Sequence, residues 1–118
     1  MSTRKVMIAA AMAAMTIAPI AASAAYDAAG TYQLRCGYCH GNQGQGTRAT
    51  NPPLGPALKG NPFVVNGSPA ALRQVIRKGR QGEKRLYNDA YPNMPAYDAG
   101  TVEDVDALVQ YLKGDLQK

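Results

Sequence analysis

Two cysteines and a histidine stand close together in the chain, and their spacing is its first chemically informative feature. Cys36 and Cys39 are separated by two residues, and His40 follows directly. Thiols three positions apart can add to the two vinyl groups on one side of a porphyrin, and the next residue then lies under the iron. This C-x-x-C-H pattern is typical of covalent haem attachment. We therefore predict one haem c, bound through Cys36 and Cys39, with His40 as an iron ligand.

Other uses of the cysteine pair fit less well. A closed structural zinc site needs four ligands, usually Cys and His, and the chain contains two cysteines and one histidine. A thioredoxin-like redox pair normally sits near a β-α-β pattern, and no strand pattern is evident in this sequence. A disulfide between the two cysteines would close a tiny loop and gain little stability. A coincidental motif is the remaining alternative to haem.

Methionine is the strong candidate for the second axial ligand, because His40 is the only histidine. The sequence contains five methionines, and all but Met94 lie within its first 15 residues, which are predicted below to be removed. Prolines at positions 92 and 95 stiffen the backbone on both sides of Met94. A lone methionine is otherwise a filler of the hydrophobic core. We expect His40 and Met94 to be the two metal ligands.

Residues 1–24 are predicted to form a secretory signal peptide. Two basic residues precede an almost unbroken apolar run over residues 6–20, and residues 22–24 form an A-x-A cleavage signal. The run is shorter than the roughly 20 apolar residues of a transmembrane helix, and an uncleaved membrane anchor is the alternative. Residues 25–118 are then one monohaem domain, exported to the periplasm, with no stable membrane insertion after cleavage.

Three helices are predicted to position the chemical groups. Asp27 can cap a short helix that runs into the cysteine motif. A second helix is expected between Ser68, a good N-cap, and Gly79, which fits just past its end. A third is expected to start at Thr101, with Asp104 completing a capping-box-like pair before an apolar stripe. The class is therefore all-α with long loops, and loops this long in a small domain need something to pack on.

The order of these features resembles that of class I c-type cytochromes over nearly the whole chain after residue 24. In that family a first helix runs into C-x-x-C-H, and a Gly-Pro loop, a middle helix, a Met-Pro loop and a C-terminal helix follow. The corresponding features here include Gly55-Pro56, Met94-Pro95 and Tyr111-Leu112. The resemblance implies the cytochrome c fold, with three to four short helices and long loops wrapped around one covalently attached haem.

The resemblance also implies roles for residues outside the motif. Pro56 resembles the family proline whose carbonyl accepts a hydrogen bond from the ligand histidine, a bond that orients the ring and increases its basicity. A simple turn residue is the alternative for Pro56. Leu58 is expected to pack on the haem edge. Tyr32 and Tyr111 resemble the aromatic residues where the first and last helices cross, with Ala28 in place of the usual glycine.

Charge is unevenly distributed along the chain. Residues 35–85 contain nine basic residues and one acidic residue, whereas residues 86–118 contain six acidic and two basic residues. The formal charge of +5 becomes +3 if Arg4 and Lys5 leave with the signal peptide. A basic cluster is expected either to steer docking to an acidic partner or to be a solvated face. Its members are Arg73, Arg77, Lys78, Arg80, Lys84 and Arg85. The loop before Met94 is expected either to supply hydrogen-bond partners for the haem propionates or to be a solvated basic loop. Its candidates are Arg80, Lys84, Arg85, Tyr87 and Asn88.

These features together predict an electron carrier rather than an enzyme. With both axial positions filled by the protein, the iron has little room for a substrate. We expect periplasmic electron transfer, as a diffusible carrier or electron-accepting partner of a dehydrogenase, with an oxidase or another cytochrome as further redox partner. A subunit bound permanently to a flavoprotein or quinoprotein dehydrogenase is the alternative, followed by a haem enzyme or sensor with a labile Met94. Export and the acidic C-terminal half argue against nucleic acid as a partner.

Overall fold

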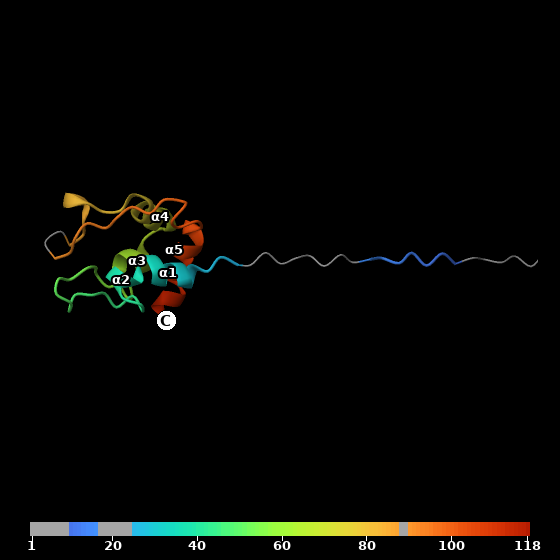
Figure 1. Cartoon of the computed structure of the whole chain (residues 1–118), viewed down its shortest axis with the longest axis horizontal. Coiled ribbons are helices and arrows are strands. Elements are labelled where there is room, and N and C mark those ends of the chain that lie inside the picture. Colours follow the sequence, from blue (N-terminus) through green and yellow to red (C-terminus); the bar gives the residue numbers. More distant parts are fainter. Residues whose placement is uncertain (1–9, 17–24, 88–89) are drawn as a thin grey trace, which may run out of the picture.

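The computed structural model describes residues 10–16, 25–87 and 90–118 (Figure 1). Within these ranges the regular structure is helical, with no β-strand and with one isolated β-bridge between Arg80 and Met94. The predicted all-α class with long loops is confirmed. The α-helices are α1 (Ala28–Arg35), α2 (Gly37–His40), α3 (Pro62–Asn66), α4 (Pro69–Lys78) and α5 (Val105–Lys113). The short 3-10 helices are η1 (Gly82–Lys84) and η2 (Asp115–Gln117).

Helix α1 begins where the sequence predicts and leads into the cysteine motif. The Asp27 carboxylate accepts a hydrogen bond from the backbone N–H of Gly30 at 2.8 Å, which satisfies one of the free donors at the helix start. Cys36 ends α1 and directly precedes α2, which contains Cys39 and His40. The motif therefore lies at the junction of two consecutive helices.

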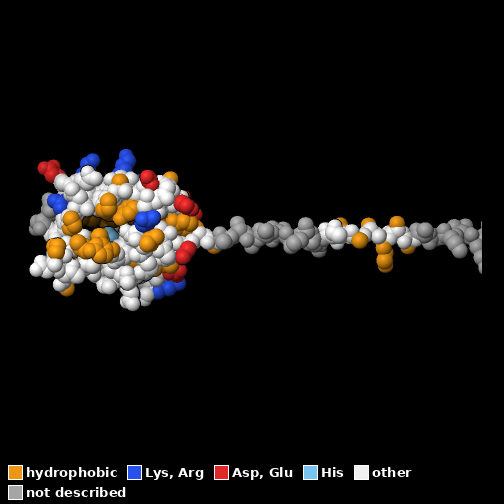
Figure 2. Space-filling view, in the orientation of Figure 1, with side chains coloured by type: hydrophobic (Ala, Val, Ile, Leu, Met, Phe, Trp, Pro, Cys, Tyr) orange, Lys and Arg blue, Asp and Glu red, His pale blue; other side chains and the backbone are white. Residues whose placement is uncertain are grey.

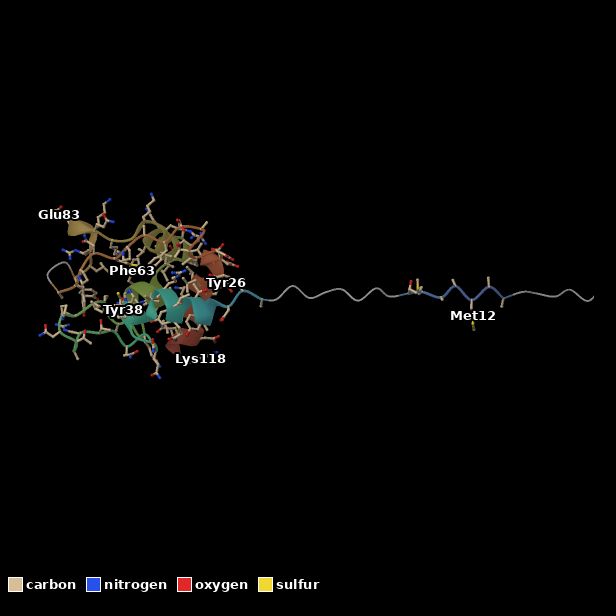
Figure 3. The ribbon with its side chains drawn as sticks, viewed as in Figure 1. Met12, Tyr26, Tyr38, Phe63, Glu83 and Lys118 are labelled. Atoms are coloured by element: carbon tan, nitrogen blue, oxygen red, sulfur yellow. The ribbon has the colours of Figure 1, made fainter. Side chains whose placement is uncertain are left out.

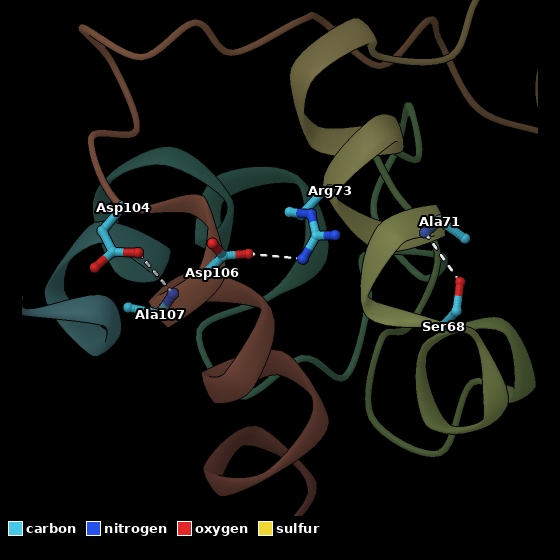
Figure 4. A network of polar contacts seen from close by, with 6 residues as sticks. All are labelled: Ser68, Ala71, Arg73, Asp104, Asp106 and Ala107. Carbon is cyan, nitrogen blue, oxygen red and sulfur yellow. Dashed lines mark hydrogen bonds and ion pairs between the residues drawn. The ribbon is translucent and has the colours of Figure 1, made fainter.

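Helix α4 also follows the prediction, and an ion pair joins it to α5 (Figure 4). The Ser68 hydroxyl accepts a hydrogen bond from the N–H of Ala71 at 3.1 Å. Arg73 Nη1 lies 2.8 Å from Asp106 Oδ1. Both side chains of this pair are substantially exposed, so the pair orients the helices more than it stabilises them.

The predicted start of the third helix at Thr101 is wrong. Helix α5 begins at Val105, and Asp104 is its N-cap, with the carboxylate accepting a hydrogen bond from the N–H of Ala107 at 2.9 Å (Figure 4). Thr101 belongs to a preceding turn in which Asp98 Oδ1 accepts from the Thr101 N–H at 2.9 Å. Both Asp98 and Asp104 accept a hydrogen bond from a backbone N–H three residues later, but only Asp104 begins a helix.

Helix α3 is an element that the sequence analysis did not predict. Asn61 Oδ1 caps it by accepting a hydrogen bond from the N–H of Phe63 at 3.0 Å. At its other end, the ammonium group of Lys113 on α5 donates to the carbonyls of Val64 at 2.9 Å and Val65 at 3.1 Å. The helix has five residues, which is too short for a clear apolar periodicity.

The hydrophobic core lies where α1, α4 and α5 pack together. The rings of Tyr32 and Tyr111 are 5.6 Å apart between centroids, which agrees with the predicted crossing of the first and last helices. The Tyr32 hydroxyl is buried and donates to the carbonyl of Gly41 at 2.7 Å. The other buried apolar side chains are Val64, Leu72, Ile76, Val102, Leu108, Val109, Leu112 and Leu116.

Only part of the predicted signal peptide falls within the described residues. Residues 10–16 contain no helix and are exposed, as the Met12 side chain illustrates (Figure 3). The predicted cleavage signal at residues 22–24 lies outside the described residues. In the part of the chain that the structure describes, no helix combines the length and the apolar character needed to cross a membrane.

Candidate functional site

A cavity opens on one face of the helical domain, beside the core. It encloses about 870 Å³ of space not filled by protein, including solvent at its mouth, and Figure 2 shows it as a hollow surrounded by hydrophobic side chains. The apolar side chains of its walls include Leu58, Phe63, Val64, Leu72, Val75, Ile76 and Leu112.

Five of the six predicted site residues line this cavity. They are Cys36, His40, Pro56, Leu58 and Met94. The sixth, Cys39, is partly buried on α2 next to His40 but is not among the lining residues. Tertiary structure therefore brings the cysteine motif, the Gly-Pro loop and the Met-Pro loop to one hollow.

His40 is held by the carbonyl of Pro56. The distance from His40 Nδ1 to Pro56 O is 2.8 Å. Because a carbonyl oxygen can only accept, Nδ1 must carry the proton, and Nε2 keeps its lone pair. Burial lowers the pKa of His40, although the hydrogen bond to Pro56 opposes this shift. A neutral imidazole with an unprotonated nitrogen is the form that ligates metals.

Met94 is held by the segment that follows helix α4. Its N–H donates to the carbonyl of Arg80 at 2.8 Å, and the N–H of Arg80 donates to the Met94 carbonyl at 3.1 Å. The chain reaches this bridge through Gly79, whose φ is +68°. A side chain at Gly79 would also collide with the Met94 carbonyl, so the approach of the two segments requires glycine here.

Comparison with known proteins identifies the family. The family model described as cytochrome C oxidase, cbb3-type, subunit III matches residues 23–112. The chain belongs to this family of c-type cytochromes. The cytochrome therefore carries a covalently bound haem c, and it is an electron carrier rather than an enzyme.

A solved structure supports the fold of the cytochrome. The crystal structure of the c-type cytochrome XoxG from Methylobacterium extorquens AM1 superposes with a TM-score of 0.50 and 19% sequence identity. The superposition covers 79% of this chain and 52% of XoxG, so this chain spans about half the length of XoxG. A search among curated proteins found no match.

The donor set of the cavity fits a haem. Its apolar walls suit a large flat ring, and its lining offers the Cys36 thiol, the free Nε2 of His40 and the thioether of Met94. Burial raises the pKa of Cys36 to about 11, with the neighbouring Cys39 adding to the shift. The described residues contain no cluster of three or more His, Cys, Asp or Glu side chains that could hold a metal ion.

Two arginines supply the positive charge at the cavity. Among the described residues, Arg80 and Arg85 are the charged side chains that line it. Arg80 lies over the Phe63 ring, 4.8 Å from the centroid, and donates to the Lys84 carbonyl at 2.8 Å. Arg85 donates to the backbone carbonyls of Gly82, at 3.1 Å, and Tyr91. Since a guanidinium has five N–H donors, each keeps donors for the carboxylates of a haem.

The predicted basic cluster is largely engaged within the chain. Besides Arg80 and Arg85, Arg73 pairs with Asp106, and Arg77 donates to the Val102 carbonyl at 2.7 Å. These cations still contribute positive potential, but their guanidinium groups also fasten loops and helices. The sequence pattern showed the charges but not these partners, of which the Asp106 carboxylate and the Val102 carbonyl come from segments distant in the chain.

One residue of the site was missed altogether by the sequence analysis. Thr47 lies in the loop after α2, and its hydroxyl contacts both the cysteine motif and the Gly-Pro loop. A threonine in a polar loop carries no motif and no periodicity. Its role depends on how the loop folds back on itself, which local sequence does not specify.

Proposed function

We propose that the haem of this cytochrome is attached through Cys36 and Cys39 and that its iron is ligated by His40 and Met94. The observation that carries the proposal is that the cavity is lined by both candidate axial ligands, from opposite ends of the domain sequence. The proton of His40 is on Nδ1, so the other ring nitrogen is available to a metal. Pro56 holds the imidazole, and Leu58 packs on the edge of the ring system.

When bound, the haem supplies an iron that accepts and releases one electron. The protein residues keep the surroundings of this iron constant. His40 is oriented by the Pro56 carbonyl, and Met94 is anchored by its backbone bridge to Arg80. The apolar walls would limit the contact of the bound haem with water. A thioether ligand in such a site favours the reduced form and raises the reduction potential.

We further propose that residues 1–24 are a signal peptide and that residues 25–118 work in the periplasm. There the cytochrome acts as a diffusible carrier or as the electron-accepting partner of a dehydrogenase, and passes electrons to an oxidase or another cytochrome. The support for export is the basic, apolar and A-x-A sequence of the first 24 residues.

A positively charged groove beside the cavity supports the proposal that the redox partner presents an acidic surface. It is lined by the cationic side chains of Lys78, Arg80 and Lys84. It shares Phe63, Val75 and Arg80 with the cavity. Glu83 on η1 is exposed, points outward from the domain (Figure 3) and does not line this groove. Positive charge next to the redox centre would speed the encounter with a negatively charged protein surface.

Optical spectroscopy of the wild-type protein and two variants tests the ligand assignment. The wild type should give a covalent c-type pyridine haemochrome and, when oxidised, the near-infrared band of methionine bound to ferric iron. Met94→Leu keeps the side-chain size but removes the sulfur, and it should lose this band and lower the reduction potential. Tyr91→Phe, which changes another cavity-lining side chain, should keep both. A wild type without the band would exclude Met94, and absence of covalent haem would overturn the whole assignment.

A further inference from the structure

The hydroxyl of Thr47 joins the two segments that hold His40. It donates to the Cys39 carbonyl at 2.7 Å, with a longer contact to the Gly55 carbonyl at 3.4 Å. It accepts hydrogen bonds from the N–H of Leu54 at 3.1 Å and of Gly55 at 2.9 Å. A hydroxyl has one donor and two acceptor positions, and all three positions of the Thr47 hydroxyl are engaged in hydrogen bonds.

The segment fastened by Thr47 contains the acceptor for the His40 ring. Pro56 follows Gly55, and its carbonyl lies 2.8 Å from His40 Nδ1. A Cβ at Gly55 would lie 2.7 Å from the Cys39 carbonyl oxygen and 3.1 Å from His40 Nδ1. The segment therefore lies directly against the cysteine motif, and a small outward movement would break the bond between Pro56 and His40.

The backbone of the same loop adds to this connection. The N–H of Thr47 donates to the Gly55 carbonyl at 3.0 Å, and the N–H of Gly46 donates to the His40 carbonyl at 2.7 Å. Residues 46 and 47 therefore bind both the motif and the Gly-Pro segment. The side-chain hydroxyl is the part of this connection that mutation can remove without altering the backbone.

We propose that Thr47 is a positioning residue for the His40 imidazole, because it fixes the Pro56 carbonyl where it accepts the Nδ1 proton. This inference rests on the proposed role of His40 as an iron ligand. A hydrogen bond at Nδ1 makes the imidazole a more basic ligand, which stabilises the oxidised state. Loosening the Pro56 carbonyl therefore raises the reduction potential.

Three variants of the holoprotein separate the hydroxyl from the rest of the side chain. Thr47→Val removes the hydroxyl with little change of shape, and Thr47→Ser keeps it. Thr50→Val is the matched control, since the Thr50 hydroxyl binds the carbonyls of Thr47 and Pro52 in the same loop, at 2.6 and 3.0 Å, without contact to the motif. The measurements are the reduction potential and, by NMR, the exchange rate of the His40 ring proton.

Thr47→Val is expected to shift the equilibrium toward reduced protein and to speed exchange of the ring proton, each by about tenfold, as when an outer partner of a metal ligand is lost. Thr47→Ser and Thr50→Val are expected to match the wild type. The proposal is wrong if Thr47→Val leaves both quantities unchanged. It is equally wrong if Thr47→Ser shifts them as far as Thr47→Val does, because the hydroxyl would then not matter.

Hydrogen exchange in the wild-type holoprotein tests the same idea without a variant. If Thr47 clamps the segment onto the motif, the amide protons of Leu54 and Gly55 and the ring proton of His40 should be released by the same opening, with the same denaturant dependence. A ring proton that stays protected while these two amides exchange would overturn the proposal. A wild type that shows no histidine ligation would instead overturn the proposed function, so the two failures are distinguishable.

Discussion

Gly55 shows how a single residue permits the close approach on which the site depends. The Pro56 carbonyl can reach the His40 ring because Gly55 has no side chain between the loop and the cysteine motif. The nearest atoms to a Cβ there would be backbone and ring atoms, led by the Cys39 carbonyl oxygen at 2.7 Å. Such atoms cannot move aside as the end of a flexible side chain can.

Gly55→Ala should therefore destabilise the holoprotein by about 1–3 kcal/mol, the usual cost of forcing extra atoms into a packed region. It should also raise the reduction potential, because the Pro56 carbonyl is pushed away from His40. Gly100→Ala is the control, since a Cβ there meets only Asp98 Oδ1 at 3.4 Å. Denaturant unfolding and redox titration measure the two effects. Equal stability of both variants would contradict this account.

At the scale of elements, cationic side chains that donate to backbone carbonyls add to the hydrophobic core in connecting the helices. Lys113 on α5 donates to carbonyls at the C-terminal end of α3, and Arg77 on α4 donates to the Val102 carbonyl before α5. A cation at a helix C-terminus satisfies free carbonyls and interacts favourably with the helix dipole. The Lys113 contacts hold α3, whose residues Phe63 and Val64 line the cavity.

Lys113→Met keeps much of the apolar stem but removes these donors, so it should lower the free energy of unfolding by about 1–3 kcal/mol. The loss should weaken the wall of the cavity formed by α3. Lys118→Met is the control, because Lys118 is an exposed lysine that pairs with Asp115 at the chain end, and its removal should change stability little. Denaturant unfolding followed by circular dichroism compares the two. A Lys113→Met protein as stable as the Lys118→Met protein would rule out the capping role.

At the scale of the whole molecule, the groove lined by Lys78, Arg80 and Lys84 places positive charge beside the cavity. Arg80 is also committed to the Lys84 carbonyl and the Phe63 ring. The two lysines are therefore better targets for testing the charge without disturbing the cavity wall.

The double variant Lys78→Glu/Lys84→Glu should lower the rate of oxidation by ferricyanide, an anion, by about tenfold at low ionic strength. It should not slow the reaction with the hexaammineruthenium(III) cation. The loss of rate with ferricyanide should shrink as salt is added, because salt screens exposed charges. Lys59→Glu, outside the groove, is the control. Stopped-flow absorbance gives the rates. Because Lys59→Glu makes one of these charge reversals and the double variant makes two, a loss for Lys59→Glu of about half that of the double variant on a logarithmic scale, or more, would mean that the groove has no special role.

The cavity leads us to expect that the fold depends on its cofactor. The chain contains a single Phe and no Trp, and an apolar cavity opens beside its core. A small domain with a thin core usually needs a supplement such as a metal or a cofactor.

Cys36→Ala/Cys39→Ala, produced without haem, should therefore have less helical signal and no cooperative thermal transition. Tyr38→Ala, a change of an exposed residue within the same motif, should keep the haem and the transition. Circular dichroism measures both proteins. Native helix content and cooperative melting in the haem-free double variant would show that the protein core is sufficient by itself.

The sequence alone determined the features that depend on neighbouring residues. The spacing of Cys36, Cys39 and His40 predicts covalent haem attachment from five neighbouring residues, and counting methionines makes Met94 the predicted second ligand. The starts of α1 and α4 were correct because a cap is a contact across three residues. The same local reasoning failed at Thr101, where two aspartates each offered a cap.

Only the tertiary structure decided which distant groups meet. The hydroxyl of Thr47, the missing Cβ of Gly55 and the ammonium of Lys113 each act on segments that no local pattern connects to them. The predicted acceptor at Pro56 came from the family resemblance, and its distance of 2.8 Å to His40 came from the structure. Such contacts form when a long loop brings distant residues together. The conformation of a long loop depends on the packing of the whole chain and not on its local sequence alone.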